Sequence, residues 1–281
     1  MRIDLHTHST ASDGTQSPAA VIASAAGADL DVIALTDHDT TLGWDQAAAA
    51  AQHHGIALVR GIEISCKDKA ISIHLLGYLH DPAAPDLLDE LEHSRESRGT
   101  RAKRIVERIS QDLPLDWDDV LEQIGPGATI GRPHIADAMV AKKIVLTRDE
   151  AFRDYLYAGS PYYATHYALD AAQAVRLVVA AGGVAVMAHP LASKRGRVVD
   201  DSVIESMAAA GMAGLEVHHR DHTPEQVLHG LDLAASLGLF VTGSSDYHGA
   251  GKVNLLGENT TDPLVLQQIE DLASGVEVLW P

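Results

Sequence analysis

The residues Ile3-Asp4-Leu5-His6-Thr7-His8 form a short strand pattern that runs directly into two histidines. Side chains two apart in an extended segment point to the same side, so the imidazoles of His6 and His8 should project together. Two imidazoles on one face supply half of the ligands of a typical protein metal site. The stretch therefore predicts a strand that ends in a metal site. These six residues alone leave a polar strand end as the alternative.

Beyond this stretch, short runs rich in β-branched residues alternate with alanine-rich helical segments. Such alternation is typical of a parallel α/β sheet or barrel with helices on its outside. The predicted strands cover residues 3–5, 31–36, 56–64, 70–78, 184–188, 214–217 and 239–242. Seven strands are one fewer than the usual eight-stranded barrel. We therefore expect either a distorted barrel or a further strand from residues 276–280.

The alternation breaks after His80-Asp81-Pro82 and resumes near residue 167. Between these points the sequence predicts helices, over residues 87–109, 117–124 and 133–140. We expect a barrel domain formed by residues 1–82 and 167–281, interrupted by a helical insertion, residues 83–166, that caps the barrel.

Histidines and acidic residues recur where the strands should end. Glu63 lies between Ile62 and Ile64, where an unpaired buried carboxylate would be costly and a cation would relieve the cost. The carboxyl ends of barrel strands meet at one face, which is the catalytic face of such enzymes. The candidate metal ligands are His6, His8, Asp13, His38, Glu63, His74, His189, Asp246 and His248.

These nine candidate ligands are too many for one ion. Two or three divalent ions fit better, with Glu63 as a bridge because a carboxylate has two oxygens. Mixed imidazole and carboxylate ligands suit transition metals better than calcium or magnesium alone. We expect Mn2+ first, with Zn2+ or Fe2+ as alternatives. Asp37 and Asp39 flank His38, and we expect them to orient its ring.

The overall composition restricts the partners of the chain. The sequence has 21 basic and 39 acidic residues, a net charge of −18 that should repel polyanions and anionic membranes. Only 4% of the residues are aromatic, which argues against stacking platforms for nucleic acid. We expect neither DNA nor a membrane as a partner; the sequence does not indicate the oligomeric state. A single cysteine, Cys66, and the absence of a signal-peptide pattern predict a cytoplasmic protein.

Several of these motifs occur in a fixed order: His6-Thr7-His8, Thr36-Asp37-His38-Asp39, Gly61-Ile62-Glu63, His74, Ala188-His189-Pro190 and Asp246-Tyr247-His248. The ordered set resembles the polymerase and histidinol phosphatase (PHP) family of the amidohydrolase superfamily. The resemblance implies a distorted seven-stranded, TIM-like (β/α)7 barrel with a trinuclear metal centre. It also implies three ligand sets: His6, His8, Glu63 and Asp246; Glu63, His74 and His189; Asp13, His38 and His248.

Within that family, the helical insertion and Gly131-Arg132-Pro133-His134 resemble the phosphatases that act on 3′,5′-nucleoside bisphosphates. This resemblance implies a phosphoesterase that hydrolyses the 3′-phosphate, releases a nucleoside 5′-monophosphate such as AMP, and uses a hydroxide bridging two metals as the nucleophile. The expected partner is a small phosphorylated nucleotide. Short RNA 5′ ends also fit, because relatives of this branch have been linked to 5′ trimming of RNA. A 5′–3′ exoribonuclease, a histidinol-phosphate phosphatase and a non-catalytic nucleotide-binding protein stay open as alternatives.

Several further residues are candidates for binding the substrate or transferring protons. Arg132 and His134 are expected to bind phosphate and assist catalysis, although Pro133 would equally suit the first turn of a helix. Among His218, His219 and His222, which follow a predicted strand, His218 is our candidate general acid. The substrate-binding candidates are Arg132, His134, Lys194, Arg195, Arg197, His218 and His222.

Overall fold

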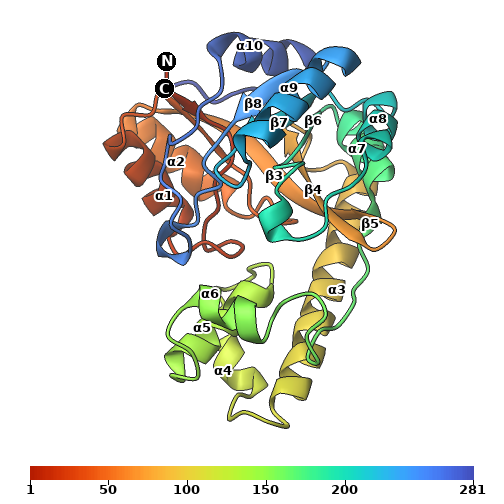
Figure 1. Cartoon of the computed structure of the whole chain (residues 1–281). Coiled ribbons are helices and arrows are strands. Elements are labelled where there is room, and N and C mark those ends of the chain that lie inside the picture. The colour runs from red at the N-terminus through yellow and green to blue at the C-terminus, as the bar shows by residue number, and fades with distance from the viewer.

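The computed structural model describes residues 1–281 and contains a barrel-shaped sheet with a separate helical lobe below it (Figure 1). Seven strands follow one another around the sheet: β1 (Ile3–Asp4), β2 (Val32–Leu35), β3 (Ala57–Asp68), β4 (Ile71–Tyr78), β6 (Val184–Met187), β7 (Gly214–His218) and β8 (Phe240–Gly243). Just beyond β1 and β8, Thr7 bridges to Tyr247 and brings the two ends of the sheet together. The expected distorted barrel is confirmed.

One strand runs against the expected parallel direction. β3 and β4 form a hairpin that reverses at Lys69 and Ala70, and β4 is antiparallel to β6 as well, whereas the other neighbours on this path are parallel. Parallel pairing needs a crossover of a dozen residues or more, and two residues cannot provide it. The expectation of a fully parallel sheet is therefore wrong for β4.

Two further details of the sheet differ from the prediction. Residues 276–280 form no strand; Leu279 makes a single antiparallel bridge to Leu58. An additional strand, β5 (Leu169–Asp170), instead pairs with β3. Two residues are too few to show a strand period in a sequence, so β5 was not predictable.

Six helices surround the barrel: α1 (Pro18–Gly27), α2 (Trp44–His54), α7 (Ala171–Ala180), α8 (Asp201–Ala209), α9 (Pro224–Leu237) and α10 (Pro263–Leu272). Side chains cap several of their first turns, as when Asp170 accepts a hydrogen bond from the N–H of Gln173. Both α2 and α9 end at a glycine in the left-handed conformation, Gly55 and Gly238. None of the helices is both long enough and apolar enough to span a lipid bilayer.

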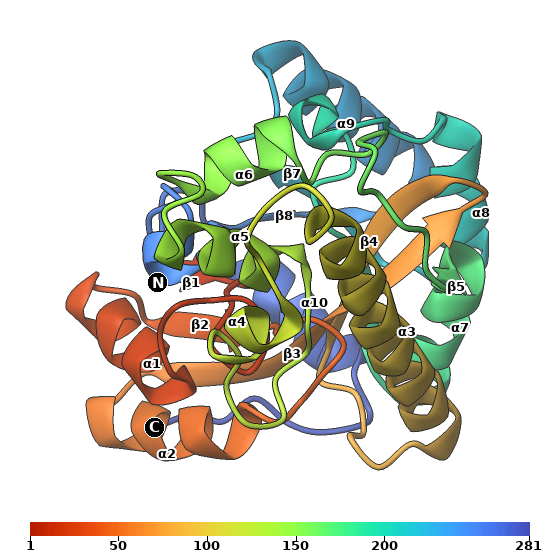
Figure 2. The same ribbon diagram turned by 90° about the horizontal axis from the view of Figure 1, so that it is seen from below.

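The lobe consists of the four helices between β4 and β5: α3 (Pro85–Ile109), α4 (Trp117–Leu121), α5 (Arg132–Ala141) and α6 (Arg148–Asp154). α3 joins the two parts of the molecule. Near its start, Leu87 belongs to a core cluster of the barrel, whereas Ile105 and Ile109 near its end belong to a separate core with Ile135. Seen from below, the lobe lies across one end of the barrel (Figure 2).

Candidate metal centre

Glu63 on β3 occupies the middle of a buried cluster of imidazoles and carboxylates. Its Oε1 lies 2.8 Å from Nδ1 of His74 and 3.2 Å from Nε2 of His189. Its Oε2 lies 3.1 Å from both Nε2 of His8 and Nδ1 of His38. The two oxygens thus face different imidazoles, as expected of a carboxylate that bridges two cations.

His6 and His8 point toward each other, as their spacing predicts. Their Nε2 atoms are 3.0 Å apart, and Oδ1 of Asp246 lies 3.5 Å and 3.4 Å from them, respectively. Backbone pairing fixes this arrangement, because the N–H of His8 donates to the Tyr247 carbonyl at 2.8 Å, directly between Asp246 and His248. Segments more than 230 residues apart in sequence therefore meet at one point.

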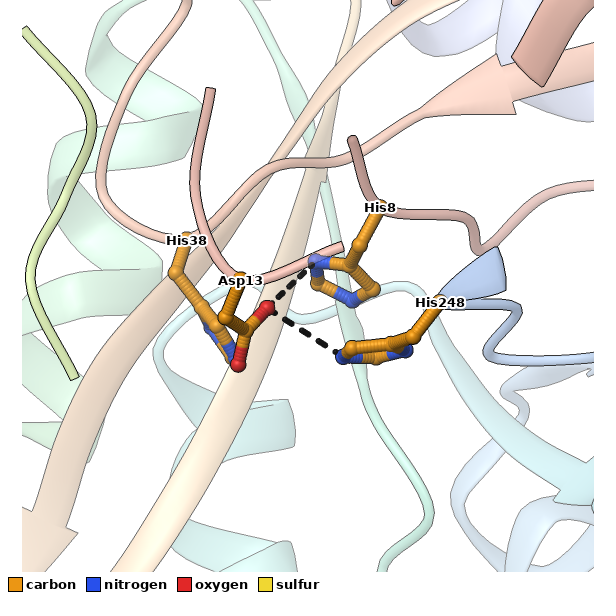
Figure 3. A group of neighbouring side chains, drawn as sticks. All are labelled: His8, Asp13, His38 and His248. Carbon is orange, nitrogen blue, oxygen red and sulfur yellow. Dashed lines mark ion pairs between the residues drawn. The ribbon is translucent and has the colours of Figure 1, made fainter. Parts of the chain in front are cut away.

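Asp13 lies among three further imidazoles of the cluster, those of His8, His38 and His248 (Figure 3). Its Oδ1 lies 3.3 Å from Nε2 of His248 and 3.9 Å from Nδ1 of His8, and its Oδ2 lies 3.6 Å from Nε2 of His38. Nδ1 of His8 is buried without a hydrogen-bond partner, and Nδ1 of His38 makes no aligned hydrogen bond although Oε2 of Glu63 lies 3.1 Å away. Because an unpaired buried polar atom is costly, this set of donors fits a divalent cation.

Electrostatics keep the carboxylates of the cluster ionised. Burial opposes ionisation of Glu63, but the nearby imidazoles, His74 first, hold its pKa well below the usual range. Burial likewise opposes protonation of His6, but Glu216, Glu63 and Asp246 together raise its pKa well above the usual range. Anionic carboxylates among imidazoles are the ligands that a metal cation requires, and its binding displaces protons from the imidazoles.

Comparisons with known proteins support the interpretation of this cluster as a metal site. The PHP domain model matches residues 4–156, which is more than half of the chain. The chain belongs to the PHP family. A 3′,5′-nucleoside bisphosphate phosphatase of Chromobacterium violaceum is 36% identical over 89% of this chain and 88% of its own length. A 5′-3′ exoribonuclease of Haemophilus influenzae is 32% identical over 88% of this chain and 90% of its own length.

One solved structure is more similar to this chain in sequence than these two relatives are. The crystal structure of a Bifidobacterium adolescentis protein, described as a metal-dependent phosphoesterase, superposes with a TM-score of 0.95 at 42% identity. It covers 97% of this chain and 96% of its own. The predicted family is confirmed, and with it the class of enzyme: the PHP protein is a metal-dependent hydrolase of phosphoester bonds.

Glu216 on β7 is part of the PHP site, although it is not among the site residues predicted from the sequence. Its Oε1 lies 2.9 Å from Nδ1 of His6, and its Oε2 accepts a hydrogen bond from the N–H of His189 at 2.8 Å. A sequence signal was available, because Glu216 lies between Leu215 and Val217 just as Glu63 lies between two isoleucines.

The two aspartates that flank His38 do not contact its ring. Asp37 accepts hydrogen bonds from the N–H and Oγ of Ser9 and from Oγ of Ser12, and so fixes the loop that leads to Asp13. Asp39 accepts from the N–H of Ser65 and pairs with Arg98 on α3. The expectation that they orient His38 is wrong, because both carboxylates are engaged by other segments.

Only one of the three basic residues after His189 enters the cluster. Nη2 of Arg195 lies 2.5 Å from Oδ2 of Asp246, and its Nε lies 2.6 Å from Asp221. Nζ of Lys252, which is not among the residues predicted from the sequence, lies 2.9 Å from the same oxygen of Asp246. Lys194 and Arg197 are exposed.

The histidines that follow β7 occupy different environments. His218 is exposed, at the end of the strand. His219 is buried, and its Nε2 lies 3.4 Å from Nη2 of Arg195 and 3.7 Å from Oδ2 of Asp246. Both ring nitrogens of His222 form hydrogen bonds with the backbone: Nδ1 donates to the Val217 carbonyl, and Nε2 accepts from the N–H of Leu191.

Arg132 and His134 lie at the start of α5 in the lobe. Nδ1 of His134 accepts a hydrogen bond from the N–H of Gly131 at 3.1 Å and so caps the helix. Nη1 of Arg132 donates to the Leu156 carbonyl, and its guanidinium lies 5.4 Å from the ring centre of Phe152. The helix start and a phosphate-binding role stay compatible, because the amides of a helix N-terminus also favour anions.

Proposed function

We propose that this PHP protein hydrolyses the 3′-phosphate of 3′,5′-nucleoside bisphosphates and releases the nucleoside 5′-monophosphate and inorganic phosphate. The observation that carries the chemistry is the position of Glu63, whose two oxygens face different imidazoles within one buried cluster. The similarity to the Chromobacterium phosphatase, 36% identity over 89% of the chain, supports the substrate.

We propose that the cluster holds three divalent ions, Mn2+ first and Zn2+ or Fe2+ as alternatives. Three groups of side chains have their ligand atoms within 4.8 Å of one another: His6, His8 and Glu63; His38, Glu63 and His74; His8, Asp13, His38 and His248. Asp246 and His189 complete the proposed set through their contacts with His6 and Glu63, respectively. Ions bound there would supply an ionised water near neutral pH and neutralise charge on the phosphate oxygens.

The chain itself contributes orientation and proton transfer. Glu216 holds the ring of His6 by one nitrogen and leaves the other directed into the cluster. Among the histidines after β7 we favour His219 over the exposed His218 as the proton donor to the leaving oxygen, because His219 faces Asp246 and Arg195. His219→Asn should then lower kcat more than His218→Asn does.

The helical segment 83–166 serves, in this proposal, as a cap over the barrel formed by residues 1–82 and 167–281. Two contacts support it. Arg98 of α3 pairs with Asp39, and Nη1 of Arg148 donates to the Asp13 carbonyl at 3.2 Å. Both contacts reach loops that carry proposed metal ligands, so the cap is in a position to shape the space above them.

The test is phosphate release by the manganese-loaded protein. Adenosine 3′,5′-bisphosphate, 5′-AMP, histidinol phosphate and a short 5′-phosphorylated RNA would be compared. We expect the bisphosphate to have the highest kcat/KM by a wide margin. Glu63→Ala should lose both activity and bound manganese, whereas Glu205→Ala, at an exposed position on α8, should keep both. A fully active Glu63→Ala protein would contradict the proposed centre.

The second candidate activity is 5′–3′ exoribonuclease, which the Haemophilus relative at 32% identity favours. It would use the same metals on a polymer. Faster shortening of the RNA than hydrolysis of the bisphosphate would select it, and preferential hydrolysis of histidinol phosphate would overturn both.

A further inference from the structure

The backbone at Asp246 adopts a conformation that most residues avoid. Its φ is +53°, in the left-handed region, where an L side chain is strained. Residues in this region persist only where neighbouring groups over-determine the backbone. Because Asp246 is also a proposed metal ligand, the groups that hold its backbone set where its carboxylate points.

Asn254 provides part of this support from a loop eight residues further along the chain. Its side-chain Nδ2 donates to the Ser245 carbonyl at 2.6 Å and to the Asp246 carbonyl at 3.2 Å. An amide nitrogen carries two N–H groups, so one asparagine can bind both carbonyls. Asn254 is buried, and water therefore does not compete for these bonds.

Asp4, the last residue of β1, holds the same segment from another side. Its Oδ1 accepts a hydrogen bond from the N–H of Ser245 at 3.0 Å, and its Oδ2 accepts one from the N–H of Gly257 at 2.9 Å. This carboxylate is completely buried and ties β1 both to Ser245 and to the loop that carries Asn254. Buried side chains thus bind both backbone polar groups of Ser245. We call Asp4 and Asn254 the Asp246 clamp.

The Asp246 clamp also acts on a second proposed ligand. Nδ1 of His248 donates to the Asp246 carbonyl at 2.9 Å, so this carbonyl accepts from both His248 and Asn254. The bond directs Nε2 of His248 toward Asp13, whose Oδ1 lies 3.3 Å away. A hydrogen bond at one ring nitrogen fixes the tautomer and orientation of a histidine ligand. Displacement of the Asp246 carbonyl would therefore also turn the ring of His248.

We propose that Asn254 and Asp4 are positioning residues of the metal centre. Asn254 places Asp246 and His248, and Asp4 anchors the loop on which Asn254 lies. The inference rests on the metal centre of the proposed function. It extends that centre to a loop, residues 254–257, beyond the last proposed ligand in the chain.

The first test is Mn2+ binding to the metal-depleted protein, measured by titration calorimetry. Asn254→Asp keeps the shape of the side chain but replaces its donor with an acceptor that faces two carbonyls. We expect Mn2+ affinity to fall about 10- to 100-fold, as is typical when a residue that orients metal ligands is lost. Wild-type affinity in a folded Asn254→Asp protein would overturn the proposal.

Asn259→Asp is the matched control for the first test. Nδ2 of Asn259 donates to the Ser244 carbonyl at 3.4 Å, one residue before the carbonyls that Asn254 binds. The substitution makes the same chemical change close by and should leave Mn2+ affinity at the wild-type value. Equal losses in the two variants would mean that general disturbance of the segment, rather than positioning of Asp246, explains the effect.

The second test separates positioning from damage to the fold. The hydrolysis of adenosine 3′,5′-bisphosphate is measured against Mn2+ concentration for each variant. A positioning role predicts that Asn254→Asp needs about 10- to 100-fold more Mn2+ for half-maximal activity, and that saturating Mn2+ restores most of kcat. A lower kcat with an unchanged midpoint would instead indicate a purely structural role and would contradict the proposal.

Asp4→Asn replaces Asn254→Asp in both tests if the latter does not fold, as judged by circular dichroism. It turns an NH2 group toward the N–H of either Ser245 or Gly257, so one of the two hydrogen bonds is lost. The Mn2+ dependence should shift in the same direction as in Asn254→Asp.

Failure of the Asp246 clamp can be told apart from failure of the proposed function. If the wild-type protein binds Mn2+ and Asn254→Asp binds it equally well, the clamp is wrong and the metal centre stands. If Mn2+ binding depends on Asn254 but the bisphosphate is not hydrolysed, the substrate is wrong and the clamp stands. A wild-type protein that binds no Mn2+ would overturn both.

Discussion

Nδ1 of His6 and Oε1 of Glu216 are 2.9 Å apart, and both side chains are completely buried. The contact fixes the ring of His6 so that its Nε2 points at His8 and Glu63. Because Glu216 also accepts a hydrogen bond from the N–H of His189, one carboxylate positions two proposed metal ligands. Loss of such an outer carboxylate typically costs a metal site about 10- to 100-fold in metal affinity or activity.

The first prediction follows from this contact. Glu216→Gln should lower manganese affinity by about 10- to 100-fold, because an amide orients an imidazole but does not stabilise it by charge. Isothermal titration with Mn2+ measures the effect, and Glu205→Gln on the surface of α8 is the control. Unchanged affinity in Glu216→Gln would show that the contact has no part in metal binding.

The second prediction concerns stability without metal. A ligand that binds only the folded state at 1,000 times its Kd adds about 4 kcal/mol to the free energy of unfolding. Urea unfolding in excess Mn2+ and in EDTA should therefore differ by a few kcal/mol for the wild-type protein. Glu63→Ala should unfold at the same urea concentration in both. If the wild-type midpoint does not move with EDTA, ions do not bind the buried cluster with useful affinity.

The third prediction concerns the link from the lobe to Asp13. Asp137 on α5 holds Nε and Nη2 of Arg148 at 2.5 Å each, and Nη1 of Arg148 donates to the Asp13 carbonyl. Asp137→Asn should loosen this link and weaken the ion nearest Asp13 by about tenfold, an effect typical of residues that support ligands. The number of bound Mn2+ per chain at limiting metal measures it, with Asp149→Asn, exposed on α6, as the control.

The fourth prediction concerns His80, which is buried beside Trp44 with both ring nitrogens unpaired. Burial lowers its pKa from 6.5 to about 4. The unfolded chain therefore takes up a proton more readily, and the free energy of unfolding should fall by about 3 kcal/mol as the pH drops from about 6.5 to about 4.

His80→Leu should remove this part of the pH dependence, because the folded and unfolded states then bind equal numbers of protons at that position. Urea unfolding of the chelated protein across the same pH range compares it with the wild type, and His53→Gln on the exposed face of α2 serves as the control. Parallel pH curves for wild type and His80→Leu would show that His80 is accessible to protons in the folded state.

Much of the architecture was readable from the sequence because its signals are local. Strand and helix periods repeat within a few residues, and the insertion shows itself as a break in their alternation. The barrel and the convergence of His6, His8, Glu63 and Asp246 follow from the rule that the carboxyl ends of barrel strands meet at one face. The single departure in direction, β4, depends on a turn of two residues.

The tertiary structure decided which side chains meet. The sequence alone did not select Glu216, did not show that Asp37 and Asp39 turn away from His38, and did not join Arg148 to the Asp13 carbonyl. These relationships connect segments tens to hundreds of residues apart. The distances between these side chains are set by how helices and strands pack, and no local sequence period encodes that packing. The order of the elements and the residues at the strand ends, by contrast, can be read from the sequence directly.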